Sequence, residues 1–238
     1  MNILAYILLF GTIILGGTTV FAFKNIKAGF LKLLLAFSGA YLFSLTVLHL
    51  IPEVYHSVES NIGIYILIGF FIQIILEFFS EGIEHGHIHI HQKHDAAFPF
   101  GVIVGLCLHS FLEGMPLVQN FSDPNTQNSL LAGIILHHIP VAIALMTMLL
   151  QSGLTKTRAL IFLIIFALMA PLGAYTASSM NLSAFQDVSL FFDKVMAIVI
   201  GIFLHISTTI LFESDKDHRV NYLKLLIIIL GAGLAMLH

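Results

Sequence analysis

Charge is scarce in this sequence, and tryptophan is absent. Asp, Glu, Lys and Arg together make up 10% of the 238 residues, whereas a soluble domain carries about 25% charged residues. Hydrophobic residues supply 58% of the chain. This balance excludes an ordinary water-soluble domain and is typical of an integral membrane protein. We therefore expect the lipid bilayer as a partner, and no nucleic acid.

Other features are also missing. There is a single cysteine, Cys107, so a disulfide framework is excluded. The first apolar window lacks a basic leading segment and an A-x-A cleavage site, which favours a retained helix over a signal peptide. No ATP-binding P-loop occurs, which implies a secondary carrier or a channel-like route. No organic cofactor is expected.

The chain consists instead of successive apolar windows, each near the 17–25 residues that a membrane-spanning helix needs. We predict one all-α integral membrane domain over residues 1–238 with eight transmembrane helices. The predicted helices are 3–23, 30–51, 61–79, 98–118, 129–151, 158–178, 189–212 and 221–237.

Basic residues indicate the orientation of these helices. Nine of the ten Lys and Arg residues flank the odd-numbered loops, and only Lys194 does not. By the positive-inside rule the odd loops are cytoplasmic and both termini are extracytoplasmic. We expect a multi-pass protein of the cell inner (plasma) membrane.

Two clusters of polar residues interrupt the apolar spans. In the fourth predicted helix, His109 and Glu113 are four residues apart, so their side chains stack on one helical face. In the fifth, His137 and His138 precede Pro140, which removes a backbone hydrogen bond and opens space beside the histidines. The short loop between these helices makes them antiparallel neighbours, with both clusters at similar depth.

Three imidazoles and one carboxylate form a suitable first shell for a divalent transition metal. The absence of thiolate argues against Cu(I). A bound cation also offsets the cost of an ionised carboxylate in lipid. The alternative is that each polar residue merely hydrogen-bonds to a neighbouring helix. We favour the metal site, with the ligands His109, Glu113, His137 and His138.

A second, weaker set of residues is interpreted as a metal pathway: His49, Glu53, Ser110, Glu77 and His205. His49 and Glu53 suit an outer station, with interfacial solvation as the alternative. His205 faces the pathway or bonds a serine such as Ser207. Glu77 belongs to an exit funnel or to a solvated helix end.

Residues 80–97 form the one strongly polar and biased segment. Histidine-rich tracts are typical of metal binding, and the alternative is a solvated linker. By topology this loop is cytoplasmic, so we expect it to tune transport rather than to form the transport site. Its candidate ligands are His85, His87, His89, His91 and His94.

Read in order, these motifs resemble the ZIP family of divalent-metal (zinc/iron) transporters. HSFLEG in the fourth helix is similar to the family's H-N-x-x-[DE]-G, and HHIP in the fifth to its H-E-x-P-[HE]-E. The segments YLFSLTVLHLIPE, APLGA and GIFLHIS add support. The resemblance implies a bundle with the fourth and fifth helices central, inward metal transport and, commonly, a homodimer. Similar residues in the second and seventh helices also hint at an inverted repeat of helices 1–3 and 6–8.

The resemblance implies two adjacent metal positions, but this chain retains one. The first would use His109, Glu113 and His137, with Val141 at the position of its fourth ligand. The second lacks most of its family ligands, and His138 is a substitute ligand. The replaced positions are Ser110, His138, Ala142 and Ala170. The metal centre is therefore expected to be reduced.

We expect a Zn²⁺ transporter that moves metal into the cytoplasm. Fe²⁺, Mn²⁺, Co²⁺ and Cd²⁺ are further candidate substrates. A site rich in histidine and poor in acid should favour Zn²⁺ over the harder Mn²⁺ and lose metal below about pH 6.5. Two alternatives are an integral-membrane zinc hydrolase, in which a bound water is activated, and a transport-inactive metal sensor.

Overall fold

The computed structural model describes residues 2–23, 28–56, 61–80, 100–179, 188–212 and 222–237. Every regular element within these ranges is helical. The elements are α1 (Ile3–Ala22), α2 (Ala28–Leu45), the π-helix η1 (Thr46–Leu50), α3 (Ile51–Tyr55), α4 (Ile62–Ser80), α5 (Phe100–Gly114), the 3₁₀-helix η3 (Met115–Val118), α6 (Pro124–Gln151), α7 (Lys156–Ser179), α8 (Val188–Phe212) and α9 (Tyr222–Ala235).

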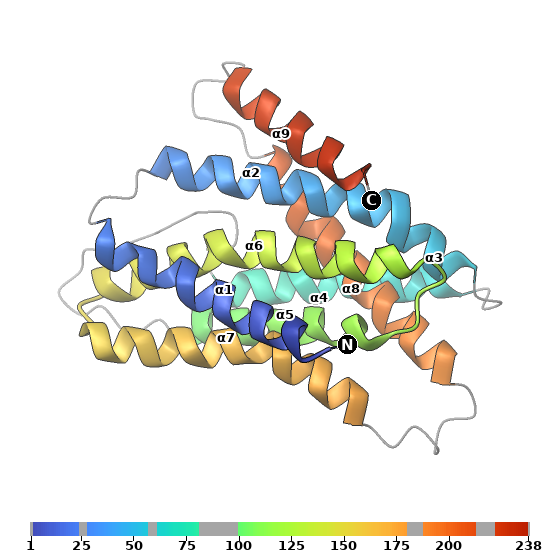
Figure 1. Cartoon of the computed structure of the whole chain (residues 1–238), viewed down its shortest axis with the longest axis horizontal. Helices are drawn as coiled ribbons and strands as arrows, with labels where there is room; N and C mark the ends of the chain where they lie inside the picture. The colour runs from blue at the N-terminus through green and yellow to red at the C-terminus, as the bar shows by residue number, and fades with distance from the viewer. Residues whose placement is uncertain are drawn as a thin grey trace.

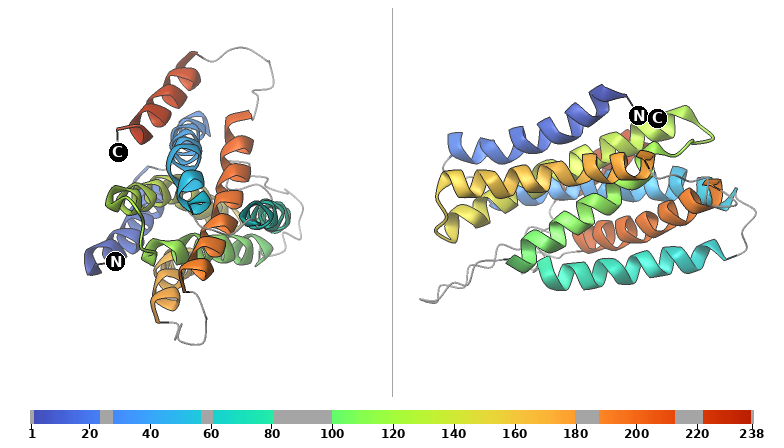
Figure 2. Two further views of the ribbon diagram at one scale, coloured as in Figure 1. Left: turned by 90° about the vertical axis from the view of Figure 1, so that its right-hand side faces the viewer. Right: turned by 90° about the horizontal axis from the view of Figure 1, so that it is seen from below.

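The prediction of eight membrane helices is confirmed. Helices α2, η1 and α3 follow one another without a break and form the second span, and α5 with η3 forms the fourth. Seven spans in the described residues are long and apolar enough to cross a membrane, and α9 is a shorter apolar helix. Both termini lie at the same end of the bundle, as an even number of crossings requires (Figures 1 and 2).

Prolines explain where the helical geometry changes. Pro52 cannot donate a hydrogen bond, and its ring crowds the carbonyl of Leu48, which lies within the π-helical turn. Pro116 acts in the same way at the end of α5, where the chain tightens into the 3₁₀-helix.

Helix α6 begins five residues earlier than predicted. Asp123 caps its N-terminus by accepting a hydrogen bond from the Asn125 amide at 2.9 Å, and Pro124 occupies the first turn. These local signals extend the helix beyond the apolar window that started at Ser129. The helix runs on through Pro140, which leaves the carbonyl of Leu136 without its usual amide partner.

The helices pack in two groups. One contains α1, α5, α6 and α7, and the other contains α2, α4, α8 and α9, while α6 meets α2 and α5 meets α4 between the groups. Glycine permits direct backbone contact within each group. A Cβ on Gly114 of α5 would overlap the Ala170 carbonyl of α7, and one on Gly69 of α4 would overlap the Ile198 carbonyl of α8.

Two pairs of helix contacts have the symmetry that an inverted repeat would produce. Helix α4 packs on α8 as α9 packs on α2, and α5 packs on α7 as α6 packs on α1. An inverted repeat exchanges each of the first three spans with the corresponding one of the last three, and the fourth span with the fifth. Under this exchange the α4–α8 contact becomes the α9–α2 contact, and the α5–α7 contact becomes the α6–α1 contact. These two pairs follow the repeat suggested by the sequence, whereas the α4–α5 contact has no α6–α9 counterpart of similar extent among the described residues.

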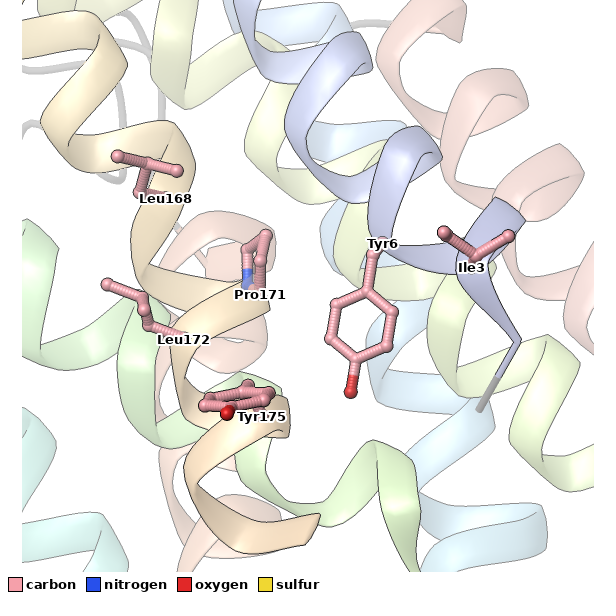
Figure 3. Close-up of a pocket in the computed structure, with 6 residues that line it drawn as sticks. All are labelled: Ile3, Tyr6, Leu168, Pro171, Leu172 and Tyr175. Carbon is pink, nitrogen blue, oxygen red and sulfur yellow. The ribbon is translucent and has the colours of Figure 1, made fainter. Parts of the chain in front are cut away.

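An open groove of about 520 Å³ lies between α1 and α7 (Figure 3). Its lining is mostly apolar, apart from the hydroxyl groups of two tyrosines. The lining residues are Ile3, Tyr6, Leu168, Pro171, Leu172 and Tyr175. None of the predicted metal ligands lines this groove.

Candidate metal centre

Glu113 lies at the centre of the candidate site, between α5 and α6. Its Oε1 atom is 3.0 Å from Nε2 of His109, and its Oε2 atom is 2.8 Å from Nε2 of His138. The side chains of all three residues are fully buried. The i, i+4 spacing on α5 therefore places His109 against Glu113, and α6 supplies the histidine on the other side.

His137 completes the cluster. Ligand atoms of His109, Glu113 and His137 all lie within 4.8 Å of one another, and all three residues are buried. The imidazole rings of His109 and His137 are 6.0 Å apart between centroids. Zinc bonds of about 2.0–2.2 Å to nitrogen and oxygen would draw these atoms closer together. The three residues can thus hold a divalent cation after small side-chain movements.

His138 lies next to this group and contacts a different neighbour. Its ring is 5.5 Å from that of Phe166 on α7, in an edge-to-face arrangement. Its Nε2 atom faces Glu113, whereas its Nδ1 atom has no hydrogen-bond partner among the described residues. His138 therefore holds the second carboxylate oxygen and remains a candidate ligand.

Burial makes this arrangement costly without a cation. An isolated carboxylate in a low-dielectric interior is strongly disfavoured, and a buried polar group without a partner costs about 1–3 kcal/mol. Within the described residues, the buried hydroxyl of Ser110 also has no hydrogen-bond partner. A divalent cation among Glu113 and the histidines would compensate the carboxylate charge and accept lone pairs from the carboxylate oxygens and imidazole nitrogens.

The positions where the family motif carries other ligands are also buried. Val141 and Ala142 lie on α6 next to the histidine pair, and Ala170 lies on α7 against Gly114. None of these three side chains can donate electrons to a metal. Glu113 is consequently the one acid of the cluster formed by His109, Glu113 and His137.

Gln73 on α4 is a site residue that the sequence interpretation missed. Its side chain is fully buried, and its Oε1 atom lies 3.2 Å from Nδ1 of His109. The available signal was a lone amide in an otherwise apolar stretch, FFIQIIL. A buried amide in lipid needs a partner, but the sequence could not identify that partner.

Glu77 and His205 lie together, one helical turn along α4 from Gln73. His205 Nε2 on α8 is 3.4 Å from Glu77 Oε2, and the side chains are 10% and 27% exposed respectively. Ser207, the serine suggested as a partner for His205, donates its hydroxyl hydrogen to the carbonyl of Phe203 instead. The pathway role of this pair remains a prediction.

His49 and Glu53 face different partners. His49 Nε2 is 3.2 Å from the carbonyl oxygen of Ala235 on α9. Glu53 Oε1 accepts a hydrogen bond from the Ser122 amide at 2.7 Å. His49 belongs to the π-helix η1, whose wider turn changes the register that would stack residues four apart. Their role as an outer metal station is still a prediction.

The histidine-rich segment 80–97 holds the remaining predicted metal ligands. Its candidate ligands lie outside the described residues: His85, His87, His89, His91 and His94. Their expected metal binding stays a prediction from the sequence.

Comparison with known proteins assigns the chain to a family. Residues 96–238, which include α5 to α9, match the sequence model of the family described as "ZIP Zinc transporter". The chain therefore belongs to the ZIP zinc transporter family. Members are membrane transporters rather than enzymes, so the hydrolase alternative is not supported.

The individual relatives are distant. Zinc transporter ZIP9-A of Xenopus laevis is 25% identical over 167 residues, which cover 64% of this chain and 52% of that protein. Zinc transporter ZIP9 of Micropogonias undulatus is 24% identical over 166 residues, covering 65% and 51%. Zinc transporter ZIP9-B of Xenopus laevis is 27% identical over 124 residues, covering 49% and 39%. The chain thus spans about half the length, or less, of these curated relatives.

Proposed function

We propose that this protein carries Zn²⁺ across the plasma membrane into the cytoplasm through the site between α5 and α6. The observation that carries the proposal is the fully buried group of His109, Glu113 and His137, whose ligand atoms lie within 4.8 Å of one another. The family and the names of the relatives support zinc as the substrate.

The donor set suits zinc in particular. Imidazole nitrogen and carboxylate oxygen are common zinc ligands, and together they replace the water that the ion loses on leaving solution. One carboxylate among several imidazoles supplies little negative charge, which disfavours the hard ion Mn²⁺ relative to Zn²⁺. We propose the same order of preference for transport.

Movement between the two helix groups would expose the site to each side in turn. Helices α5 and α6 carry the ligands and belong to one group, while α4 and α2 of the other group cover them. Backbone contact at Gly114 and Gly69 favours rigid packing inside each group. Contacts between the groups include a hydrogen bond of 3.1 Å from the Tyr41 hydroxyl on α2 to the Ser129 carbonyl on α6. This bond can break and form again as the groups move.

The route towards the cytoplasm would pass Glu77 and His205. By the positive-inside rule, the end of α4 that carries Glu77 is cytoplasmic, and the same side holds the histidine-rich loop. We propose that the Glu77–His205 pair receives the ion after it leaves Glu113. Dimer formation, which is common in the family, stays a prediction.

Zinc uptake into proteoliposomes tests this proposal. Vesicles containing the purified full chain and a zinc-sensitive dye should show uptake that is lost in His109→Ala and in Glu113→Ala. His56→Ala is the matched control, because this histidine lies at the end of α3 and is exposed. Zinc binding without any flux in the unmodified protein would contradict transport and favour the metal sensor.

A further inference from the structure

We propose that Gln73 is a positioning residue for zinc binding, which fixes the tautomer and ring orientation of His109. This inference rests on the proposed role of His109 as a ligand. Gln73 Oε1 lies 3.2 Å from His109 Nδ1, and both side chains are fully buried. The contact comes from α4, in the helix group that does not carry the ligands.

The chemistry of the amide decides which ring nitrogen carries hydrogen. An amide oxygen only accepts hydrogen bonds, so His109 Nδ1 must donate to Gln73. A neutral imidazole has one donor and one acceptor nitrogen. With a hydrogen fixed at Nδ1, the Nε2 atom, 3.0 Å from Glu113 Oε1, can give up its own hydrogen and offer its lone pair to a metal that binds beside the carboxylate.

Without Gln73 the opposite tautomer would be favoured. The Glu113 carboxylate is a stronger acceptor than an amide and would attract the ring hydrogen to His109 Nε2. That nitrogen would then bond to Glu113 and have no lone pair for zinc. Metal-binding histidines generally donate the hydrogen of their other ring nitrogen to a carbonyl, carboxylate or water, and loss of this partner typically lowers metal affinity 10–100-fold.

The same bond also restrains the ring. The contact at Nδ1 ties His109 to α4, so rotation about its side-chain bonds would break this contact and turn Nε2 away from Glu113. Gln73 thus contributes to affinity without touching the metal. Its removal should change zinc binding much more than it changes folding.

A double-mutant cycle on the full chain tests this role. The five loop histidines are replaced by serine in every variant so that the buried site dominates binding. The zinc dissociation constant is measured by competition with a fluorescent chelator for Gln73→Met, Gln73→Asn, Gln73→Glu and His109→Ala, and for the Gln73→Met/His109→Ala double variant. Asn shortens the side chain and withdraws the acceptor, whereas Glu retains an acceptor oxygen.

Gln73→Met and Gln73→Asn should weaken zinc binding about 10–100-fold. Gln73→Glu should stay within a few-fold of the starting protein. The double variant should bind no more weakly than His109→Ala alone, because both changes remove one interaction. Gln119→Met is the matched control, since it removes a buried glutamine that bonds Asp193 at 3.1 Å, and it should leave affinity unchanged.

Unchanged affinity in Gln73→Asn and Gln73→Met, with weakened binding in His109→Ala, would overturn the role of Gln73 alone. Additive losses in the double variant would overturn it as well. Unchanged affinity in His109→Ala would instead contradict the ligand assignment on which the proposed function rests. If one Gln73 variant fails to fold, the other provides the cycle, with unfolding temperature as the check.

Discussion

Replacing Gly114 by alanine should disable the metal site without touching a ligand. An added Cβ would overlap the carbonyl oxygen of Ala170 and would lie 2.8 Å from the Ala170 Cα atom. Carbon atoms in contact are normally about 3.5–4.0 Å apart, so α5 and α7 must separate by about 1 Å. Overpacking of this kind typically costs about 1–3 kcal/mol.

The separation matters because Glu113 is the neighbouring residue. Metal sites tolerate ligand displacements of about 0.2 Å, and a 1 Å misplacement of a reacting group can cost about 100-fold. We expect zinc uptake by Gly114→Ala proteoliposomes to fall at least about 10-fold, together with a lower unfolding temperature.

Gly101→Ala on the same helix is the matched control for this substitution. Among the described residues, its Cβ would meet only the Phe79 carbonyl oxygen, at 3.2 Å, which needs a small adjustment. Alanine otherwise favours helix over glycine, so near-normal uptake is expected. Unchanged uptake and stability in Gly114→Ala would refute the inference that α5 and α7 are locked together beside the site.

Further predictions concern selectivity and release. A 10-fold excess of Mn²⁺ should leave Zn²⁺ uptake nearly unchanged, because the site offers one carboxylate among imidazoles. Equal competition by the two ions would contradict the preference for Zn²⁺ over Mn²⁺. Glu77→Gln and His205→Ala should lower the maximal uptake rate and leave equilibrium zinc affinity of the buried site unchanged, since this pair lies outside the site. A loss of affinity as large as that of Glu113→Ala would show that the pair acts in the site itself.

Hydropathy predicted the spans because a helix in lipid must satisfy every backbone polar group with its own hydrogen bonds and expose apolar side chains to the lipid. It located the described helices to within a few residues, except at the start of α6. There, the cap formed by Asp123 and Pro124 extends the helix into a polar segment, so an apolar window could not find its start.

The convergence of His109 and Glu113 with the histidines of α6 also followed from the sequence. Helical periodicity placed the first two on one face, and the cost of buried polar groups required partners nearby. In the structure, His138 Nε2 lies 2.8 Å from Glu113 Oε2.

Contacts between distant helices could not be predicted in the same way. Gln73 is 36 residues from His109, and no periodic pattern connects them. His49 and Glu53 looked like a pair at helical spacing, yet the π-turn caused by the nearby proline directs them to α9 and to Ser122. Short-range patterns give the faces of helices, whereas long-range packing decides which faces meet.

X-ray absorption spectroscopy of the zinc-loaded protein tests the central claim most directly. The full chain, with the five loop histidines replaced by serine, should show a zinc shell of nitrogen and oxygen at about 2.0–2.2 Å, with scattering from imidazole rings. His109→Ala should lose this signal. A sulfur neighbour at about 2.3 Å, or an unchanged spectrum in His109→Ala, would contradict a zinc site formed by His109, Glu113 and His137.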